Sequence, residues 1–140
     1  MGGRGRRTMN DWKKVLIAVD DTPTSDKGLA YAGNIIGKLE GVQVCLLHIY
    51  PEPPPDYYSK GDSLTDYKRQ REEQAAEVLD RSTNTLAGFG IGQEAISRDV
   101  RMAEQTTISE AILDAQRQGE FGTVVVGKRG VSKAEEFLFG

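Results

Sequence analysis

Four short apolar stretches alternate with amphipathic segments along the 140 residues of the chain. Residues 13–21, 42–50 and 121–127 each have a continuous apolar centre of strand length, which is typical of strands buried on both faces of a parallel sheet. Residues 95–102 instead alternate apolar and polar side chains, and this pattern predicts an edge strand with one face in water.

Segments with helical periodicity lie between these predicted strands. Their apolar residues recur at steps of three and four, so each helix would bury one stripe. We expect the helices over residues 22–41, from Leu64 or Asp66 to about Ala87, and from the capping box Thr107–Glu110 to Gly119. The predicted buried positions are Leu29, Ala32, Ile36, Leu39, Ala75, Val78, Leu79, Leu86, Ile108, Ala111, Ile112 and Ala115. After the last strand, residues 131–140 are expected to begin a fourth helix.

The resulting order βαβαβαβ predicts an α/β fold, an open parallel sheet with helices on both faces, similar to a Rossmann fold. Ligands of such sheets bind outside the carboxyl ends of the strands. In this chain those ends carry Val19-Asp20-Asp21, His48-Ile49-Tyr50 and Val126-Gly127-Lys128. The proline-rich segment 51–63 follows the second strand and is expected to form a surface loop.

Composition narrows the class of protein. With 38% hydrophobic and 28% charged residues, and no apolar stretch near the roughly 20 residues of a membrane span, we expect one soluble cytoplasmic domain without a membrane partner. We assign residues 13–140 to this domain and residues 1–12 to a disordered basic tail or a cloning remnant. The net charge of −3 combines a basic tail with an acidic body, which argues against nucleic-acid binding.

Few single side chains point to catalysis. Cys45 is the only cysteine and His48 the only histidine, and both lie in an apolar strand, so we expect core side chains and no metal cluster. Asp20 and Asp21 are candidates for ligand contact or Mg²⁺ binding, although turn and helix-capping roles also explain carboxylates at this place. No nucleophile stands beside an evident base, so we expect no enzymatic activity beyond slow ATP hydrolysis.

Glycines give the most specific signal. Residues 88–92 follow a helix and precede a strand, the reverse of a dinucleotide fingerprint, and residues 122–128 place a strand where a P-loop needs a loop. The segment Gly127-Lys128-Arg129-Gly130 has the right context, because it follows a buried strand and precedes a predicted helix. Its backbone N–H groups can approach an anion, and its two basic residues add positive charge. A simple strand-to-helix turn is the alternative interpretation.

Three segments, VLIAVDDTPTS, VCLLHIYPE and VVVGKRGVSKAEEFLFG, together resemble the universal stress protein (UspA) family over residues 13–140. The nucleotide-binding branch of that family carries G-x2-G-x9-G, and Gly127, Gly130 and Gly140 fit this spacing. The resemblance implies a stress-response protein that binds ATP, alone or with Mg²⁺, and forms a homodimer or another oligomer. In the family a hydroxyl residue, a helix and a fifth strand follow the third glycine, so we expect a truncated domain that lacks both elements.

The resemblance also implies a set of nucleotide contacts. The implied residues are Ala18, Val19, Asp20, Ile49, Val126, Gly127, Lys128, Arg129, Gly130 and Gly140. Ala18-Val19 would line the base pocket, the Ile49 backbone would hydrogen-bond adenine, and Asp20 would face the ribose and adenine. Val126-Gly127 would cover the ribose, and the last two glycines would approach the phosphates. The chemistry agrees, because a carboxylate accepts hydrogen bonds from ribose hydroxyls and an apolar pocket holds a purine face.

Two functions of different classes therefore stand. The first is an ATP-binding regulatory module without rapid turnover, which the glycine spacing and Asp20 support. The alternative is an interaction or dimerisation module that has the same fold and binds no nucleotide.

Overall fold

The structure is a computed structural model that describes residues 11–58, 61–127 and 137–139. Its strands and helices, in chain order, are β1 (Lys14–Ala18), α1 (Pro23–Ile36), β2 (Gln43–Pro51), α2 (Leu64–Ala87), β3 (Ile96–Ala103), α3 (Ile108–Gly119), β4 (Thr123–Val126) and β5 (Phe137–Phe139). Short 3-10 turns at Asp11–Lys13 and Gln93–Ala95 precede β1 and β3. Within this described part, no helix has the length and apolar character needed to cross a membrane.

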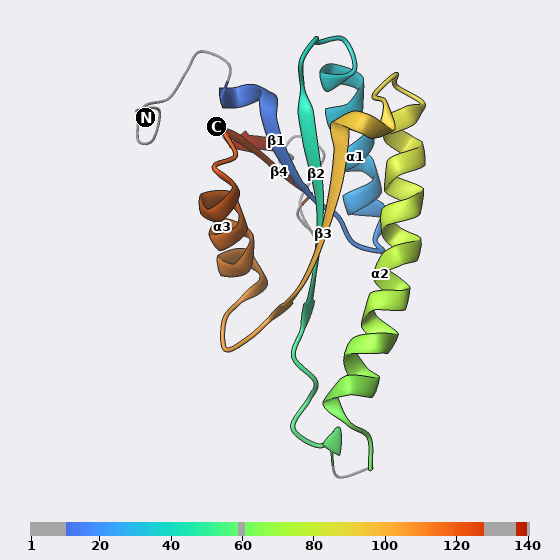
Figure 1. Cartoon of the computed structure of the whole chain (residues 1–140), viewed down its shortest axis with the longest axis vertical. Helices are drawn as coiled ribbons and strands as arrows, with labels where there is room; N and C mark the ends of the chain where they lie inside the picture. Colours follow the sequence, from blue (N-terminus) through green and yellow to red (C-terminus); the bar gives the residue numbers. More distant parts are fainter. Residues whose placement is uncertain (1–10, 59–60, 128–136, 140) are drawn as a thin grey trace.

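The strands form one sheet in the order β3-β2-β1-β4-β5. The first four are mutually parallel, with Ala18 of β1 paired to Leu47 of β2 on one side and to Val126 of β4 on the other. The helices α1 and α2 cover one face and α3 covers the opposite face (Figure 1). The predicted α/β class and the predicted edge position of β3 are therefore confirmed.

The end of the chain differs from the expectation. Phe137–Phe139 form a short strand that runs antiparallel to β4, with Leu138 opposite Val125. A helix was expected over these residues and no fifth strand was expected. Phenylalanine is enriched in strands, and pairing with β4 satisfies backbone groups that an open edge would leave without partners.

Alternation along β1 divides the core into two layers. Val15 and Ile17 pack with α1 and α2, whereas Leu16 packs with α3, and all three side chains are buried. Cys45 lies in the α3 layer, as expected for a small buried hydrophobe, and burial raises the pKa of its thiol. Burial of a strand on both faces is typical of the interior of a parallel sheet.

The helices follow the predicted stripes except near their ends. The helix α1 ends at Ile36, so Leu39 lies beyond it and is 38% exposed. Ile108 is 44% exposed although the periodicity places it on the buried stripe. It is the first residue of α3, and helical side chains tilt toward the N-terminus, so this one points past the end of the helix. The other ten predicted stripe positions are buried.

The predicted ends of α2 and α3 are confirmed. At the end of α3, however, the glycine has a different role from the one expected. Gly88 caps α2 and Gly90 has φ of +92°, so the glycine cluster 88–92 is a helix exit and turn. The helix α3 does end at Gly119, but the left-handed residue is Glu120, with φ of 55°. A Cβ at Gly119 would lie 2.2 Å from the Phe121 ring, so this glycine makes room for an aromatic side chain.

The capping box at the start of α3 is complete. The Thr107 hydroxyl accepts a hydrogen bond from the Glu110 amide at 3.0 Å, and the Glu110 carboxylate accepts one from the Thr107 amide at 3.4 Å. The Thr107 hydroxyl also donates to the same carboxylate at 3.2 Å. The hydrogen bonds that the Thr107 amide and hydroxyl donate hold the pKa of Glu110 below its ordinary value of 4.5.

Replacement of Thr107 by alanine should therefore lower the free energy of unfolding by about 1 kcal/mol, measured by urea denaturation.

The stabilisation of α3 by this capping box also depends on pH. Because the pKa of Glu110 is lowered in the folded state, its contribution is present above the unfolded value near 4.5 and is lost as pH falls. The stability gap between wild type and Glu110→Gln should thus shrink between pH 7 and pH 3. Ser109→Ala, at an exposed position of the same turn, is the control, and an equal loss there would contradict the assignment.

Candidate functional site

The carboxyl ends of β1, β2 and β4 meet at one edge of the sheet. Ala18 lies between Leu47 and Val126 in the strand register, and β2 continues past this level through Ile49 to Pro51. Ala18 and Val126 are partly buried against the α3 layer. In Figure 1 this edge lies between the start of α1 and the start of α3. It is the edge at which parallel sheets bind ligands.

Side chains fix the turn that leaves β1. Val19 is buried, its amide donates to the Leu47 carbonyl at 2.8 Å, and its carbonyl accepts from Nδ1 of His48 at 2.9 Å. The next amide, that of Asp20, donates to the hydroxyl of Ser25 at 2.9 Å. The backbone polar groups of this turn are thus held from two elements, β2 and α1.

The carboxylate of Asp20 is exposed and oriented. Its Oδ1 accepts a hydrogen bond of 2.5 Å from the Thr22 hydroxyl. That same hydroxyl accepts from the Ser25 amide at 3.1 Å and caps α1, so one threonine ties the carboxylate to the helix start. Within the described residues, Oδ2 of Asp20 has no hydrogen-bond partner and is available to an external donor.

The neighbouring carboxylate points to a different partner. Arg81 of α2 contacts Asp21 at 3.3 Å and Asp26, in the first turn of α1, at 3.5 Å. All three side chains are well exposed, so these ion pairs add little stability. They connect α2 to the start of α1 and leave Asp20 as the carboxylate at the sheet edge.

Gly127, at the end of β4, packs directly against the start of α1. A Cβ at this position would lie 2.8 Å from the Thr24 carbonyl oxygen and 3.2 Å from the Ser25 Cα atom. The facing glycine of the helix, Gly28, would place its own Cβ at 3.5 Å from the Gly127 Cα atom, which is ordinary contact. Close packing of strand and helix therefore requires a glycine at 127, independently of any ligand.

Six of the residues expected at the site lie together at this edge: Ala18, Val19, Asp20, Ile49, Val126 and Gly127. The others, Lys128, Arg129, Gly130 and Gly140, lie outside the described residues, as does the start of the tail at residues 1–10. His48 is half-buried and hydrogen-bonded, in agreement with a satisfied core histidine. Its contact with the turn after β1 was not predicted, because no sequence signal links residues 29 positions apart.

The proline-rich loop beside the site is anchored by aromatic packing. The Tyr57 ring lies 5.2 Å from that of Tyr67, whose hydroxyl donates to the Pro51 carbonyl at 2.5 Å. Glu52 accepts a hydrogen bond from the Gln105 amide at 2.9 Å, which joins this loop to the one before α3. The first part of the expected surface loop is therefore held against α2 and against the loop before α3.

The sequence matches a family model over residues 11–140, and the model describes the universal stress protein family. The chain belongs to that family. Among proteins of curated function, no sequence matches this chain.

Solved structures agree with this membership in fold. A universal stress family protein from Burkholderia pseudomallei has 18% identity and a TM-score of 0.67, with 86% of this chain and 85% of that chain covered. UspA from Lactobacillus plantarum has 13% identity and a TM-score of 0.66, with 87% and 83% covered. A universal stress protein from Archaeoglobus fulgidus, solved in complex with dAMP, has 18% identity and a TM-score of 0.56, with 81% and 78% covered.

The packing of this universal stress protein domain around Gly127 predicts opposite effects for two similar substitutions. Gly127→Ala should lower the free energy of unfolding by about 1–3 kcal/mol, because the added methyl group meets the α1 backbone. Gly28→Ala should raise it by about 0.5–1 kcal/mol, because alanine favours the helix and the space allows it. Urea denaturation of both variants measures this, and a neutral Gly127→Ala would refute the packing role.

Proposed function

We propose that this protein is a cytoplasmic regulatory module that binds an adenine nucleotide, ATP in the first place, without rapid turnover. The observation that supports this most is the exposed Asp20 carboxylate, which Thr22 holds at the carboxyl edge of the sheet and whose Oδ2 has no hydrogen-bond partner among the described residues. The Ile49 backbone lies on the next strand at the same edge. An acceptor for hydroxyls beside a backbone edge suits a nucleoside.

The described residues fit the nucleoside part of ATP. Ribose hydroxyls would donate to Asp20, and the apolar Ala18 and Val19 would lie beside the base. The phosphates would lie over the glycine segment that begins at Gly127, where the sequence supplies backbone N–H groups and two basic side chains. No cluster of three metal-ligating side chains exists among the described residues, so Mg²⁺ would enter with the phosphates as its main ligands.

The chemistry of the edge supports regulation rather than catalysis. His48 is the only histidine of the chain, its Nδ1 is engaged by the Val19 carbonyl, and no hydrogen bond joins it to a serine, threonine or cysteine side chain among the described residues. Nucleotide occupancy would instead be sensed by other proteins or by a second copy in a homodimer. The dAMP bound by the Archaeoglobus protein supports an adenine nucleotide as the ligand class.

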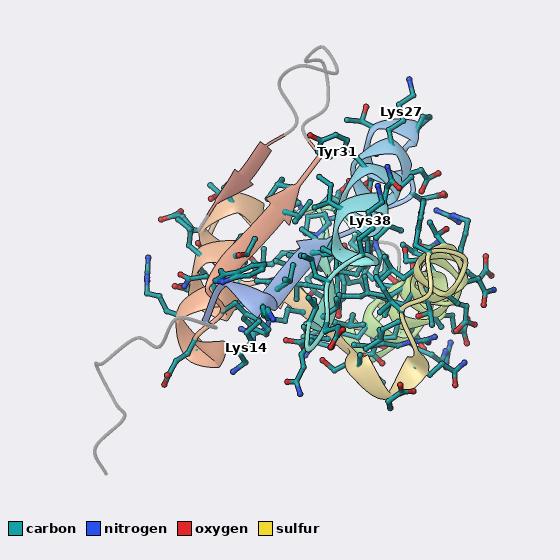
Figure 2. The ribbon with its side chains drawn as sticks, turned by 90° about the horizontal axis from the view of Figure 1, so that it is seen from above. Lys14, Lys27, Tyr31 and Lys38 are labelled. Atoms are coloured by element: carbon teal, nitrogen blue, oxygen red, sulfur yellow. The ribbon has the colours of Figure 1, made fainter. Side chains whose placement is uncertain are left out.

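A second function, a nucleotide-free interaction module, is favoured by the outer side of α1. Tyr31 is 55% exposed and Ile35 is 38% exposed there. Figure 2 labels Lys27 and Tyr31 on α1 and Lys38 just after the end of this helix, and all three are exposed. A surface that combines apolar and cationic side chains can bind a partner. Equilibrium binding of ATP to the purified protein separates the two functions, since the interaction module would show none.

Asp20→Ala should weaken ATP binding by on the order of 10- to 100-fold, because a charged acceptor of ribose hydroxyls is lost. Asp21→Ala, which removes the adjacent carboxylate that pairs with Arg81, should change the dissociation constant by less than about threefold. Isothermal titration of both variants, with far-UV spectra to verify folding, measures the difference. Equal losses in the two variants would remove Asp20 from the site.

A further inference from the structure

The hydrogen-bond ladder between β1 and β2 lacks the last backbone hydrogen bond that its register would allow. The register pairs Ala18 with Leu47, so the next pair in a parallel ladder would be Val19 with His48. Such a pair makes two backbone hydrogen bonds, from the Val19 amide to the Leu47 carbonyl and from the Ile49 amide to the Val19 carbonyl. The first is present at 2.8 Å. In place of the second, Nδ1 of the His48 ring lies 2.9 Å from the Val19 carbonyl oxygen.

The His48 ring replaces the Ile49 amide as the donor to the Val19 carbonyl, and this carbonyl cannot go without a donor. Val19 is only 4% exposed, so its carbonyl needs a partner inside the protein. A carbonyl oxygen only accepts hydrogen bonds, so the His48 ring must carry its hydrogen on Nδ1. The chain then turns away, because the Asp20 amide donates to the Ser25 hydroxyl of α1 rather than to β2.

Ile49 is consequently left with an open backbone edge. Its amide and carbonyl face the side of β2 on which β1 has ended, since alternate residues of a strand direct both groups to the same neighbour. Neither group bonds to the turn after β1 within the described residues. The Ile49 side chain is buried, so what the residue offers at the sheet edge is one donor and one acceptor.

A donor beside an acceptor is complementary to one edge of adenine. The exocyclic N6 amine of adenine donates, and the ring nitrogen next to it accepts. Guanine carries an acceptor, O6, at the place of that amine, and two acceptors facing each other are unfavourable. With the ribose held at Asp20, guanine in the same orientation would set its O6 acceptor against the Ile49 carbonyl, so the open Ile49 edge would favour adenine.

We propose that His48 is a positioning residue for adenine recognition, because its ring takes the Val19 carbonyl and so keeps the Ile49 amide free for the base. This inference rests on the proposed function, since it assigns the base selectivity of the same site. Without the ring donor, the Ile49 amide is the backbone group placed to satisfy the buried carbonyl, and the ladder would extend across the base subsite.

Two substitutions separate this role from simple packing. Asparagine places an amide N–H at the same number of bonds from Cβ as Nδ1 of histidine, whereas leucine fills similar space without a donor. We expect His48→Leu to weaken ATP binding about 10-fold and to reduce the preference for ATP over GTP by a similar factor. His48→Asn should keep both within about threefold of wild type. Fluorescence or calorimetric titration with ATP and with GTP gives these values.

Amide hydrogen exchange tests the ladder itself without a nucleotide. In the wild type the Ile49 amide should exchange faster than that of Leu47, and in His48→Leu its exchange should slow as it bonds to Val19. ATP should protect the same amide in the wild type. Slow Ile49 exchange in the wild type would overturn the proposal even if His48→Leu failed to fold.

These measurements also distinguish failure of the His48 role from failure of the proposed nucleotide binding. A wild type that binds no ATP overturns both. A wild type that binds ATP selectively, together with a folded His48→Leu that keeps its affinity, selectivity and exchange rates, overturns only the role of His48.

Discussion

The structure depends on how its central strand ends. The strand β1 is paired on both sides and covered on both faces, so each backbone group at its end must find a partner or reach water. Val19 is buried and has no further strand residue after it, and a histidine ring satisfies its carbonyl. Ser25 satisfies the next amide. The turn at the candidate site is thus held by side chains, which frees the backbone of the neighbouring strand.

A second constraint acts on the other side of β1. The helix α1 approaches the end of β4 so closely that Gly127 has no space for a side chain. The same helix begins with Thr22, whose hydroxyl orients Asp20. One helix start therefore fixes both the carboxylate after β1 and the backbone at which the glycine segment begins. Residues that look like ligand contacts in the sequence also have structural roles here, and substitution data need stability measurements beside binding measurements.

The sequence predicted the parallel order of elements well because strands buried on both faces and helices with one apolar stripe leave clear periodicities. Prediction from periodicity failed at positions where the end of an element or one tertiary contact sets the structure. Leu39 and Ile108 follow the period but lie past or at a helix end, and Phe137–Phe139 pair with β4 instead of starting a helix. At the site, the position of Asp20 followed from strand ends, whereas the ring of His48 reaching Val19 follows only from the register between β1 and β2.

Charge at the start of α1 is arranged so that one carboxylate remains available. Three aspartates lie within the turn and first helical residues, a concentration of negative charge that would repel a polyphosphate. Two of these aspartates, Asp21 and Asp26, form ion pairs with Arg81 of α2. Asp20 makes no ion pair among the described residues, and its partner is the neutral hydroxyl of Thr22. Under the proposed function, hydroxyl groups would meet this carboxylate, whereas the phosphates would meet the basic segment after Gly127. Under that function, a nucleotide would lie with its ribose toward Asp20 and its phosphates toward the segment after Gly127.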